Sequence, residues 1–437
     1  MLRSKWIKVV SVLTVSALIG TGCAANAKED ITEVTPDVAV EESAEATSEN
    51  KSESTEQMGS SEEALSDFEK WASEEVEWPS WAEPIEMEIS NDIKYGPSVR
   101  KTFSLEEAQE IIGKLRYLVE NTEGTVEHPY HNIWKGNLGT GLLQLGEYQL
   151  AYQFLNDVYT LPEDAPFGTD KVDGNVVILT KGEEQPHKRI HGRILKALSM
   201  AGFKDEVLEM YAKEDYTNIE NVHSWGVTSA AWAMDNIGEN ELAYELFDSV
   251  AQPEAFGEAR PYQASSNILA AAAFAYQHGD YEKAVGYTDR IVSEGVEPMN
   301  LAYFKGQDLE SERRMVYYNR HWKSSFAIAQ GWHALAQRAL NGEVASFDNL
   351  KDGVYTKENT GYMLTPIIVE VTVEGGKVTQ ITADQPGDKD DRSAAALATI
   401  PGRIVEAGSL EVDSISSATI STESIKLSVA EALLQAK

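Results

Sequence analysis

Cysteine is almost absent from this 437-residue chain, in which Cys23 is the single example. One thiol cannot close an internal disulfide, assemble an iron–sulfur cluster or supply the Cys-x-x-Cys-His attachment site of a c-type haem. Any redox chemistry must therefore use an organic cofactor or a metal site without cysteine.

Positive charge is also scarce, because 37 lysines and arginines stand against 71 acids and give a net charge of −34. Such a charge repels the phosphates of nucleic acid and disfavours direct adsorption to anionic lipid. We therefore expect no nucleic-acid partner. The 42% hydrophobic content and nine tryptophans are enough for a substantial core, and the length predicts two or three domains.

The first 22 residues have the pattern of a secretory signal. Arg3, Lys5 and Lys8 precede an apolar stretch, Val9 to Ile19, which is too short to span a bilayer permanently. The sequence Gly20-Thr21-Gly22-Cys23 resembles a bacterial lipoprotein cleavage box. It predicts that Cys23 carries a diacylglyceryl anchor on the extracellular face of a Gram-positive-type cell membrane. An ordinary secretory signal with an incidental cysteine is the alternative.

Residues 23–75 predict a disordered acidic tether. Fourteen acids and three lysines lie between Ala24 and Lys70, and the first aromatic residue of that stretch is Phe68. Such a segment buries too little apolar surface to offset its ordering entropy, and its like charges extend it. At its end, the segment Trp71 to Trp81 mixes aromatics, acids and proline, which predicts docking onto the following helices or, alternatively, stacking on carbohydrate.

Residues 76–345 predict an all-α array of helical hairpins. Four segments share one plan, in which an apolar helix, a turn glycine and a second helix with a small residue five positions after the glycine follow one another. They are Leu142–Tyr152, Ala197–Val207, Asp235–Tyr244 and Tyr276–Val285. The plan resembles the tetratricopeptide repeat with irregular spacing, and the resemblance implies a concave groove for a peptide or protein.

Some aromatic and histidine residues of the array remain ambiguous. The segments Pro129–Trp134 and Tyr317–Trp322 could line the groove, although packing in hairpin seams is the favoured interpretation. The pairs His187/His191 and His128/His131 have helix-face spacing but no third ligand. We expect them to be loop or surface histidines and expect no metal site.

The pattern changes at about Leu350. Alternating residues in Ile367–Val373, a turn at Glu374-Gly375-Gly376 and a second run at Lys377–Thr382 predict a β-hairpin. A helix is expected from Ser393 to Ala407, interrupted by Pro401-Gly402. A second, amphipathic helix is expected from Thr422 to Ala436.

The run Asp413-Ser414-Ile415-Ser416-Ser417-Ala418-Thr419 precedes that last helix. It resembles the attachment signature of the FMN-binding domain family, in which a flavin transferase esterifies the phosphate of FMN to the final hydroxyl. Here that hydroxyl belongs to Thr419. The resemblance covers residues 350–437 and includes Asp352–Tyr355, Gly361-Tyr362 and Pro386-Gly387 in the family's order.

The resemblance implies a small α+β domain with covalent FMN. The cofactor-binding residues that it implies are Thr419, Asp413, Ser416, Ser417, Ala418, Gly361 and Tyr362. Small residues before Thr419 allow close approach of a phosphate, and the amides of the next helix can hold it. Asp413 serves the attaching enzyme or fixes the turn.

Two departures concern the flavin pocket, because Met363-Leu364-Thr365 replaces a glycine-rich turn and Asp384-Gln385-Pro386-Gly387 replaces Glu-Thr-Pro-Gly. The whole chain is thus expected to be a multi-domain surface lipoprotein that carries electrons from a membrane donor to an extracellular acceptor, rather than a self-contained reductase. The alternative is a lipoprotein scaffold that binds a protein or peptide through its helices and has a flavin-free C-terminal domain, whose Ser/Thr-rich segment only caps the last helix.

Overall fold

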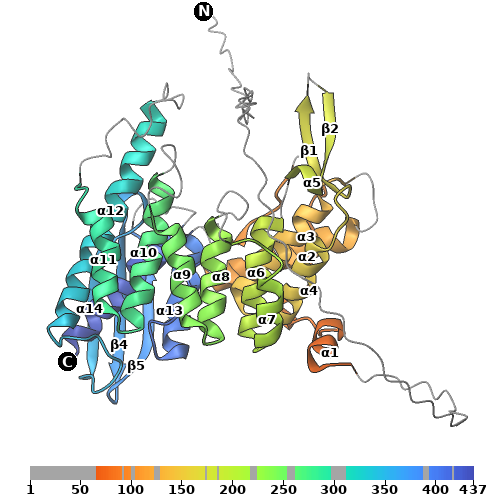
Figure 1. Cartoon of the computed structure of the whole chain (residues 1–437). Helices are drawn as coiled ribbons and strands as arrows, with labels where there is room; N and C mark the ends of the chain where they lie inside the picture. The colour runs from red at the N-terminus through yellow and green to blue at the C-terminus, as the bar shows by residue number, and fades with distance from the viewer. Residues whose placement is uncertain are drawn as a thin grey trace, which may run out of the picture. The chain divides into compact units, whose positions relative to one another are not determined.

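Antiparallel helical hairpins form the middle of the chain in the computed structural model (Figure 1). Each pair is joined by a short turn, and each pair packs against the next. The pairs are α3 (His131–Leu145) with α4 (Tyr148–Tyr159), α6 (His187–Met200) with α7 (Lys204–Tyr211), α8 (Ser224–Asn236) with α9 (Asn240–Val250), and α10 (Pro261–Gln277) with α11 (Tyr281–Val292).

The hairpin turns follow the sequence plan. Gly146, Gly202, Gly238 and Gly279 have φ values of 90°, 85°, 81° and 74°, in the left-handed region that favours glycine. At each turn the next amide donates to the carbonyl five residues earlier, as Glu147 does to Leu142 at 3.0 Å. The hairpin prediction is confirmed, whereas membership of the tetratricopeptide family stays a prediction.

Further helices lie before, between and after these pairs. They are α1 (Asp67–Ser73), η1 (Ser80–Ala82), α2 (Leu105–Thr122), α5 (Lys181–Glu184) and the long α12 (Glu312–Leu340). Strands β1 (Pro166–Val172) and β2 (Asn175–Thr180) form an antiparallel hairpin that projects from the helices (Figure 1). This hairpin was not predicted, although Asp173-Gly174 between two short runs is a recognised hairpin signal.

The Trp71–Trp81 segment docks onto the array, and this interpretation is confirmed. The Trp71 ring lies 5.1 Å from the ring of Tyr152 and 4.8 Å from that of Phe203, and the Gln149 amide donates to the Trp71 carbonyl at 2.6 Å. Helix α1 therefore packs on α4, so the last part of the stretch that composition assigned to a disordered tether is a helix.

The tryptophans of the two ambiguous aromatic segments pack in the interior. Trp134 is fully buried and donates its indole N–H to the Ile93 carbonyl at 2.9 Å. Trp322 is buried and donates to the Gly295 carbonyl at 3.1 Å. These rings belong to hairpin seams rather than to the wall of an open groove.

The C-terminal part begins with a three-stranded antiparallel sheet in the order β3-β4-β5. Its strands are β3 (Gly353–Thr360), β4 (Pro366–Glu374) and β5 (Lys377–Asp384), with the short helix η5 (Tyr362–Leu364) between the first two. Gly375 and Gly376, with φ of 59° and 77°, make the turn between β4 and β5, as expected for a two-residue hairpin loop. The predicted hairpin is confirmed.

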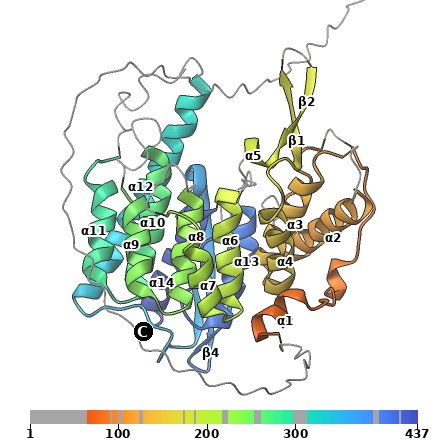
Figure 2. The same ribbon diagram turned by 45° about the vertical axis from the view of Figure 1, so that its right-hand side comes forward.

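Helix α13 (Ala394–Ala407) packs on β5 and also reaches α2 (Figure 2). The expected interruption at Pro401 is wrong, because the helix runs through this buried proline without a break. Proline removes one amide donor from the ladder, and the tight packing of the remaining residues holds the helix together.

Helix α14 (Thr419–Gln435) is not amphipathic, which corrects the sequence prediction. Every residue from Ile420 to Ala430 is buried, because β3 and β4 cover one side of the helix and α10 and α12 cover the other. The last helix thus inserts between the sheet and the helical array. Residues 63–437 form one compact unit.

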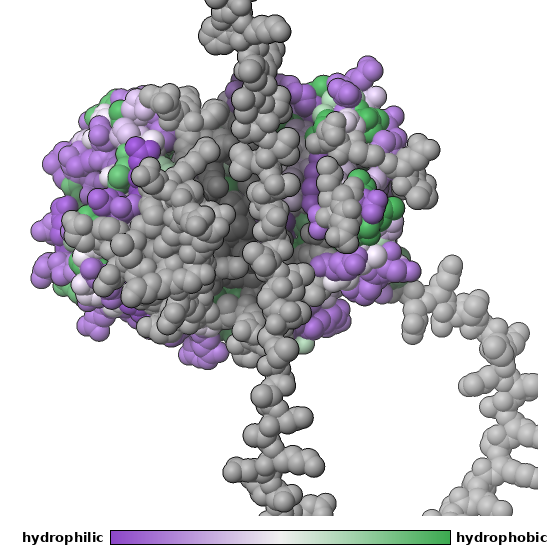
Figure 3. Space-filling model, turned by 90° about the horizontal axis from the view of Figure 1, so that it is seen from above, coloured by the Kyte–Doolittle hydropathy of each residue, from purple (hydrophilic) through white to green (hydrophobic). Residues whose placement is uncertain are grey.

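The structure describes residues 65–90, 93–99, 104–122, 128–172, 175–184, 187–216, 224–252, 261–296, 312–386, 393–415 and 418–437. The predicted signal sequence, Cys23 and the tether up to residue 64 lie outside these ranges, as do Ser416, Ser417 and Gly387. Within them, no helix has the length and apolarity that crossing a bilayer demands. The described surface seen from above is mainly hydrophilic (Figure 3).

Candidate functional site

The candidate attachment hydroxyl lies at the start of a helix. Thr419 is the first residue of α14, and the half-buried side chain follows the buried Ala418 at the N-cap. No described side chain caps this helix end, and the first turn, all of it described, holds no acid. The first amides of a helix have no partner within the helix, so this end can accept an anion.

Hydroxyl groups connect the first turn of α14 to its surroundings. The Ser421 and Ser393 hydroxyls lie 2.8 Å apart, which joins the start of α14 to the start of α13. The Thr422 hydroxyl accepts a hydrogen bond from the Ile415 amide at 3.3 Å. The segment that carries Asp413 is therefore held against the turn that carries Thr419.

A buried ion pair follows Thr419 along the same helix face. Glu423 and Lys426 stand four and seven residues after Thr419, a spacing that places side chains on one face. Both are fully buried, and Lys426 Nζ lies 3.5 Å from Glu423 Oε1, which also accepts a hydrogen bond from Ser414 at 2.5 Å. Burial raises the pKa of the Glu423 carboxyl and lowers that of the Lys426 ammonium.

The helical array contributes further cations to this region. Lys196 of α6 forms an ion pair with Asp413, and only 12% and 14% of the two side chains are exposed. Burial lowers the pKa of Lys196 well below its ordinary value, and the nearby charges of Arg403, Lys426 and Arg193 lower it further.

Sequence reasoning placed Asp413 in the attachment run but gave it no partner. The structure shows that the partner of Asp413 is Lys196, which lies 217 positions earlier in the chain. Lys196, Arg403, Glu423 and Lys426 were all missed. Glu423 and Lys426 could have been noticed as opposite charges inside an apolar helical run, whereas nothing in the sequence distinguishes Lys196.

The predicted Gly361-Tyr362 element forms a tight turn against α12. Tyr362 is buried, with its ring 5.5 Å from that of His321, and the Leu364 amide donates to the Ser324 hydroxyl at 2.7 Å. A side chain at Gly361 would meet Ile367 at 2.7 Å, so this position requires a very small residue. The structure thus joins this turn to the array rather than to the first turn of α14.

Two of the three residues that replace the glycine-rich turn keep a backbone that suits glycine. Met363 and Leu364 have φ values of 57° and 63°, which are strained for residues with a side chain. The Thr365 hydroxyl donates to the Tyr362 carbonyl and accepts a short hydrogen bond from the Gln385 amide. Gln385 directly follows β5 and is fully buried, and its Oε1 has no hydrogen-bond partner among the described residues.

The histidines do not match the surface expectation. His191 is buried, with Nδ1 2.6 Å from the Tyr216 hydroxyl and Nε2 2.9 Å from the Met210 carbonyl, so that prediction is wrong for His191. The half-buried His131 lies 2.8 Å from the Thr122 hydroxyl, and the His187 side chain lies outside the described residues. In the described ranges, no three histidines, cysteines or acids gather as a metal site would require.

Comparison with known proteins identifies the C-terminal part. The family model of the FMN-binding domain matches residues 363–434, which include β4, β5, α13, the attachment run and most of α14. Residues 363–434 therefore form an FMN-binding domain. No curated protein matches the chain, and no solved structure does.

Proposed function

We propose that this protein is an electron carrier with FMN attached covalently to Thr419. The observation that carries the proposal is the position of Thr419 inside the matched FMN-binding domain, at a helix end that no described side chain caps and whose first turn holds no acid. A phosphate esterified there would meet the partial positive charge of the helix N-terminus.

The residues present fit a phosphate-linked cofactor. The half-buried Thr419 hydroxyl supplies the ester oxygen, and the α14 amides and the cations around Asp413 offset negative charge. The net change is one O–P ester in place of the Thr419 proton and one phosphate hydroxyl, so the adduct is FMN less one water. When bound, FMN supplies one- and two-electron chemistry.

The protein's own residues would hold and orient that group. Ser393, Ser421 and Thr422 fix the first turn of α14, and the ion pair between Lys196 and Asp413 holds the attachment segment against α6. We infer that Asp413 positions the segment for the flavin transferase and for the finished carrier, since its carboxylate is committed to Lys196.

The remaining parts of the proposal concern location. A diacylglyceryl group on Cys23 would anchor the chain at the outer face of the membrane, and the acidic segment after it would give the flavin domain reach. A membrane donor and an extracellular acceptor are then the redox partners. The sequence box around Cys23 and the composition of residues 24–64 support this part.

Absorbance of protein co-expressed with a flavin transferase tests the proposal. The wild-type protein should be yellow after denaturation and gel filtration, and dithionite should bleach it in the native state. Thr419→Ala should be colourless and folded, and the matched control Thr419→Ser should keep the colour because it keeps the hydroxyl. A colourless wild-type protein would refute flavin attachment and favour the alternative, a scaffold without flavin.

A further inference from the structure

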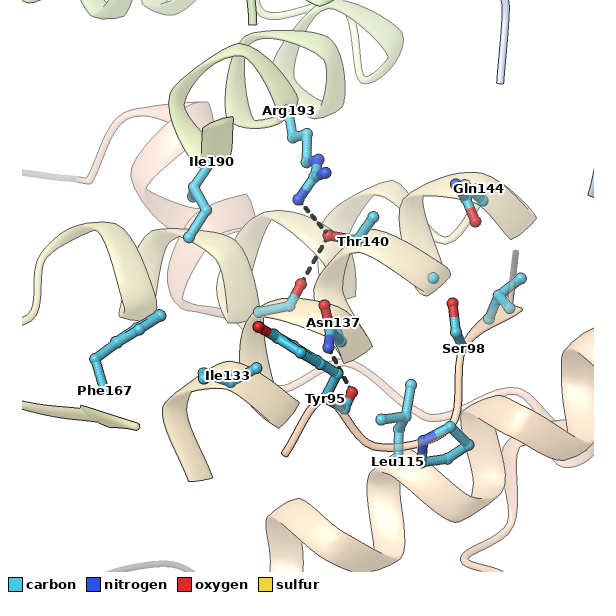
Figure 4. A pocket seen from close by; sticks show the side chains of 14 residues that line it. Tyr95, Ser98, Leu115, Ile133, Asn137, Thr140, Gln144, Phe167, Ile190 and Arg193 are labelled. Carbon is cyan, nitrogen blue, oxygen red and sulfur yellow. Dashed lines mark hydrogen bonds between the residues drawn. The ribbon is translucent and has the colours of Figure 1, made fainter. Parts of the chain in front are cut away.

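A cavity of about 360 Å³ lies in the first part of the helical array, outside the matched FMN-binding domain (Figure 4). It is lined by residues of α2, α3, α6, the strand β1 and the segment before residue 100, and it is open to solvent on one side. Its size is within the range of small-molecule sites, which are commonly about 300–1,000 Å³. None of the residues assigned to flavin attachment lines it.

One part of the cavity wall offers polar groups. Arg193 alone carries a charge among the described lining residues, and its guanidinium donates to the Thr140 hydroxyl at 2.9 Å (Figure 4). Gln144 lines the same cavity and is only 8% exposed, yet its Nε2 donor has no hydrogen-bond partner among the described residues. A buried donor without a partner costs free energy, so a ligand acceptor at this point would relieve it.

The other part of the wall is apolar. Ile133, Phe167 and Ile190 lie together on one side of the cavity in Figure 4, and Leu115 lines another part. The Tyr95 ring, which is 64% exposed, also lines the cavity. The site therefore combines a cationic, donor-bearing end with an apolar end of similar extent.

We propose that this cavity binds a small organic carboxylate with an aromatic or short aliphatic body. The carboxylate would accept from Arg193 and from Gln144 Nε2, and the apolar body would contact Ile133, Phe167 and Ile190. Charge-assisted bonds of this kind are the stronger ones in proteins. The proposal holds whether or not Thr419 carries FMN.

The local charge favours an anion despite the net charge of −34. Arg193 is three residues before Lys196 on α6, and its charge contributes to the lowered pKa of Lys196. Arg403 of α13 donates to the backbone carbonyl of Gln144. The cavity thus borders the cation-rich contact between the array and the FMN-binding domain, where a bound anion would be stabilised.

Isothermal titration calorimetry with 3-phenylpropanoate and its neutral analogue 3-phenylpropanamide tests the proposal on the mature chain. We expect the carboxylate to bind about tenfold or more tightly than the amide. Arg193→Gln should remove that preference, and the matched control Arg290→Gln, on α11 away from the cavity, should keep it. Equal affinity of the two probes, or no binding up to about 1 mM, would overturn the proposal.

A cavity-filling variant provides an independent check. A Cβ at Gly136 would have no neighbour closer than 3.9 Å, the Ile190 Cδ1 atom, so Gly136→Leu should fold with its helix intact and occupy the cavity. We expect it to abolish binding of both probes while circular dichroism stays unchanged. Unaltered binding in this variant would show that the probe sits elsewhere.

Flavin attachment is separated from ligand binding by comparing two forms. Flavinylated wild-type protein and flavin-free Thr419→Ala protein should bind 3-phenylpropanoate with equal affinity. If only the flavin-free form bound it, the cavity would belong to the flavin and the proposal would fall. If no FMN were found at Thr419, the proposed function would fail while the titrations would still decide the ligand site.

Discussion

Gly331 of α12 lies at a close approach between the helical array and the FMN-binding domain. A Cβ at this position would overlap the side chain of Leu427 on α14, and Leu427 is fully buried. In an open helix, Gly→Ala stabilises by about 0.5–1 kcal/mol, whereas overpacking a dense core costs about 1–3 kcal/mol. We therefore predict that Gly331→Ala lowers the free energy of unfolding by about 1–2 kcal/mol.

Gly286 of α11 is the matched control, because a Cβ there meets nothing within 4 Å. Gly286→Ala should raise the free energy of unfolding by about 0.5–1 kcal/mol. Urea unfolding followed by circular dichroism measures both variants, and their midpoints should move in opposite directions.

Truncation of the partner side chain tests the contact itself. Leu427→Ala alone should cost about 2–5 kcal/mol, but Gly331→Ala should no longer destabilise a protein that already carries Leu427→Ala. The two changes should therefore couple by about 1–3 kcal/mol. If Gly331→Ala stabilised the protein as much as Gly286→Ala does, α12 and α14 would not pack as described.

Three further predictions concern the FMN-binding domain. Glu423→Gln should lower the free energy of unfolding by about 3–5 kcal/mol at neutral pH, because it leaves Lys426 buried without its carboxylate partner. Adding Lys426→Met should restore most of that loss, as measured by urea unfolding. If the effects of the two substitutions simply added, the pairing of Glu423 with Lys426 would be contradicted. Because burial raises the pKa of Glu423, the folded state favours its protonated form. The protein should therefore be most stable with respect to this group below the ordinary value of about 4.3 and lose part of that stability as the pH rises through the raised pKa, while the pair with Lys426 offsets the rest of the cost of the buried carboxylate. The Glu423→Gln/Lys426→Met protein should lack that slope, and an unchanged slope would exclude Glu423 as its source. Leu364→Gly should raise the free energy of unfolding by about 0.5–1 kcal/mol, because it removes strain at φ 63° from a side chain that is 42% exposed. The control Leu340→Gly, at the exposed last residue of α12, should lower it; a destabilised Leu364→Gly protein would refute the strain.

The elements that local sequence determines could be predicted. The turn glycines of the hairpins specify a backbone conformation that few other residues adopt, and the alternation in β4 specifies a sheet with one buried face. The attachment run also identified the start of α14, because its small and hydroxyl-bearing residues favour a helix beginning. These signals act over a few residues, so no tertiary information is needed to interpret them.

The features that the sequence analysis missed depend on distant partners. Helix α14 was expected to expose one face, but α10 and α12 cover that face, and no pattern within residues 419–435 encodes this. The pairing of Asp413 with Lys196 arises only when α6 meets the C-terminal domain. The cavity beside Arg193 likewise arises only when α2, α3, α6 and β1 come together. The continuous helix through Pro401 shows tertiary packing overriding a local helix breaker.

The most direct test of covalent flavin attachment is the mass of one tryptic peptide. Trypsin cuts after Arg403 and Lys426, so residues 404–426 form one peptide that contains Thr419. After co-expression with a flavin transferase, this peptide should be heavier by one FMN less one water, and fragmentation should place the added mass on Thr419. An unmodified peptide from fully processed protein, or the same mass on another residue, would contradict the account.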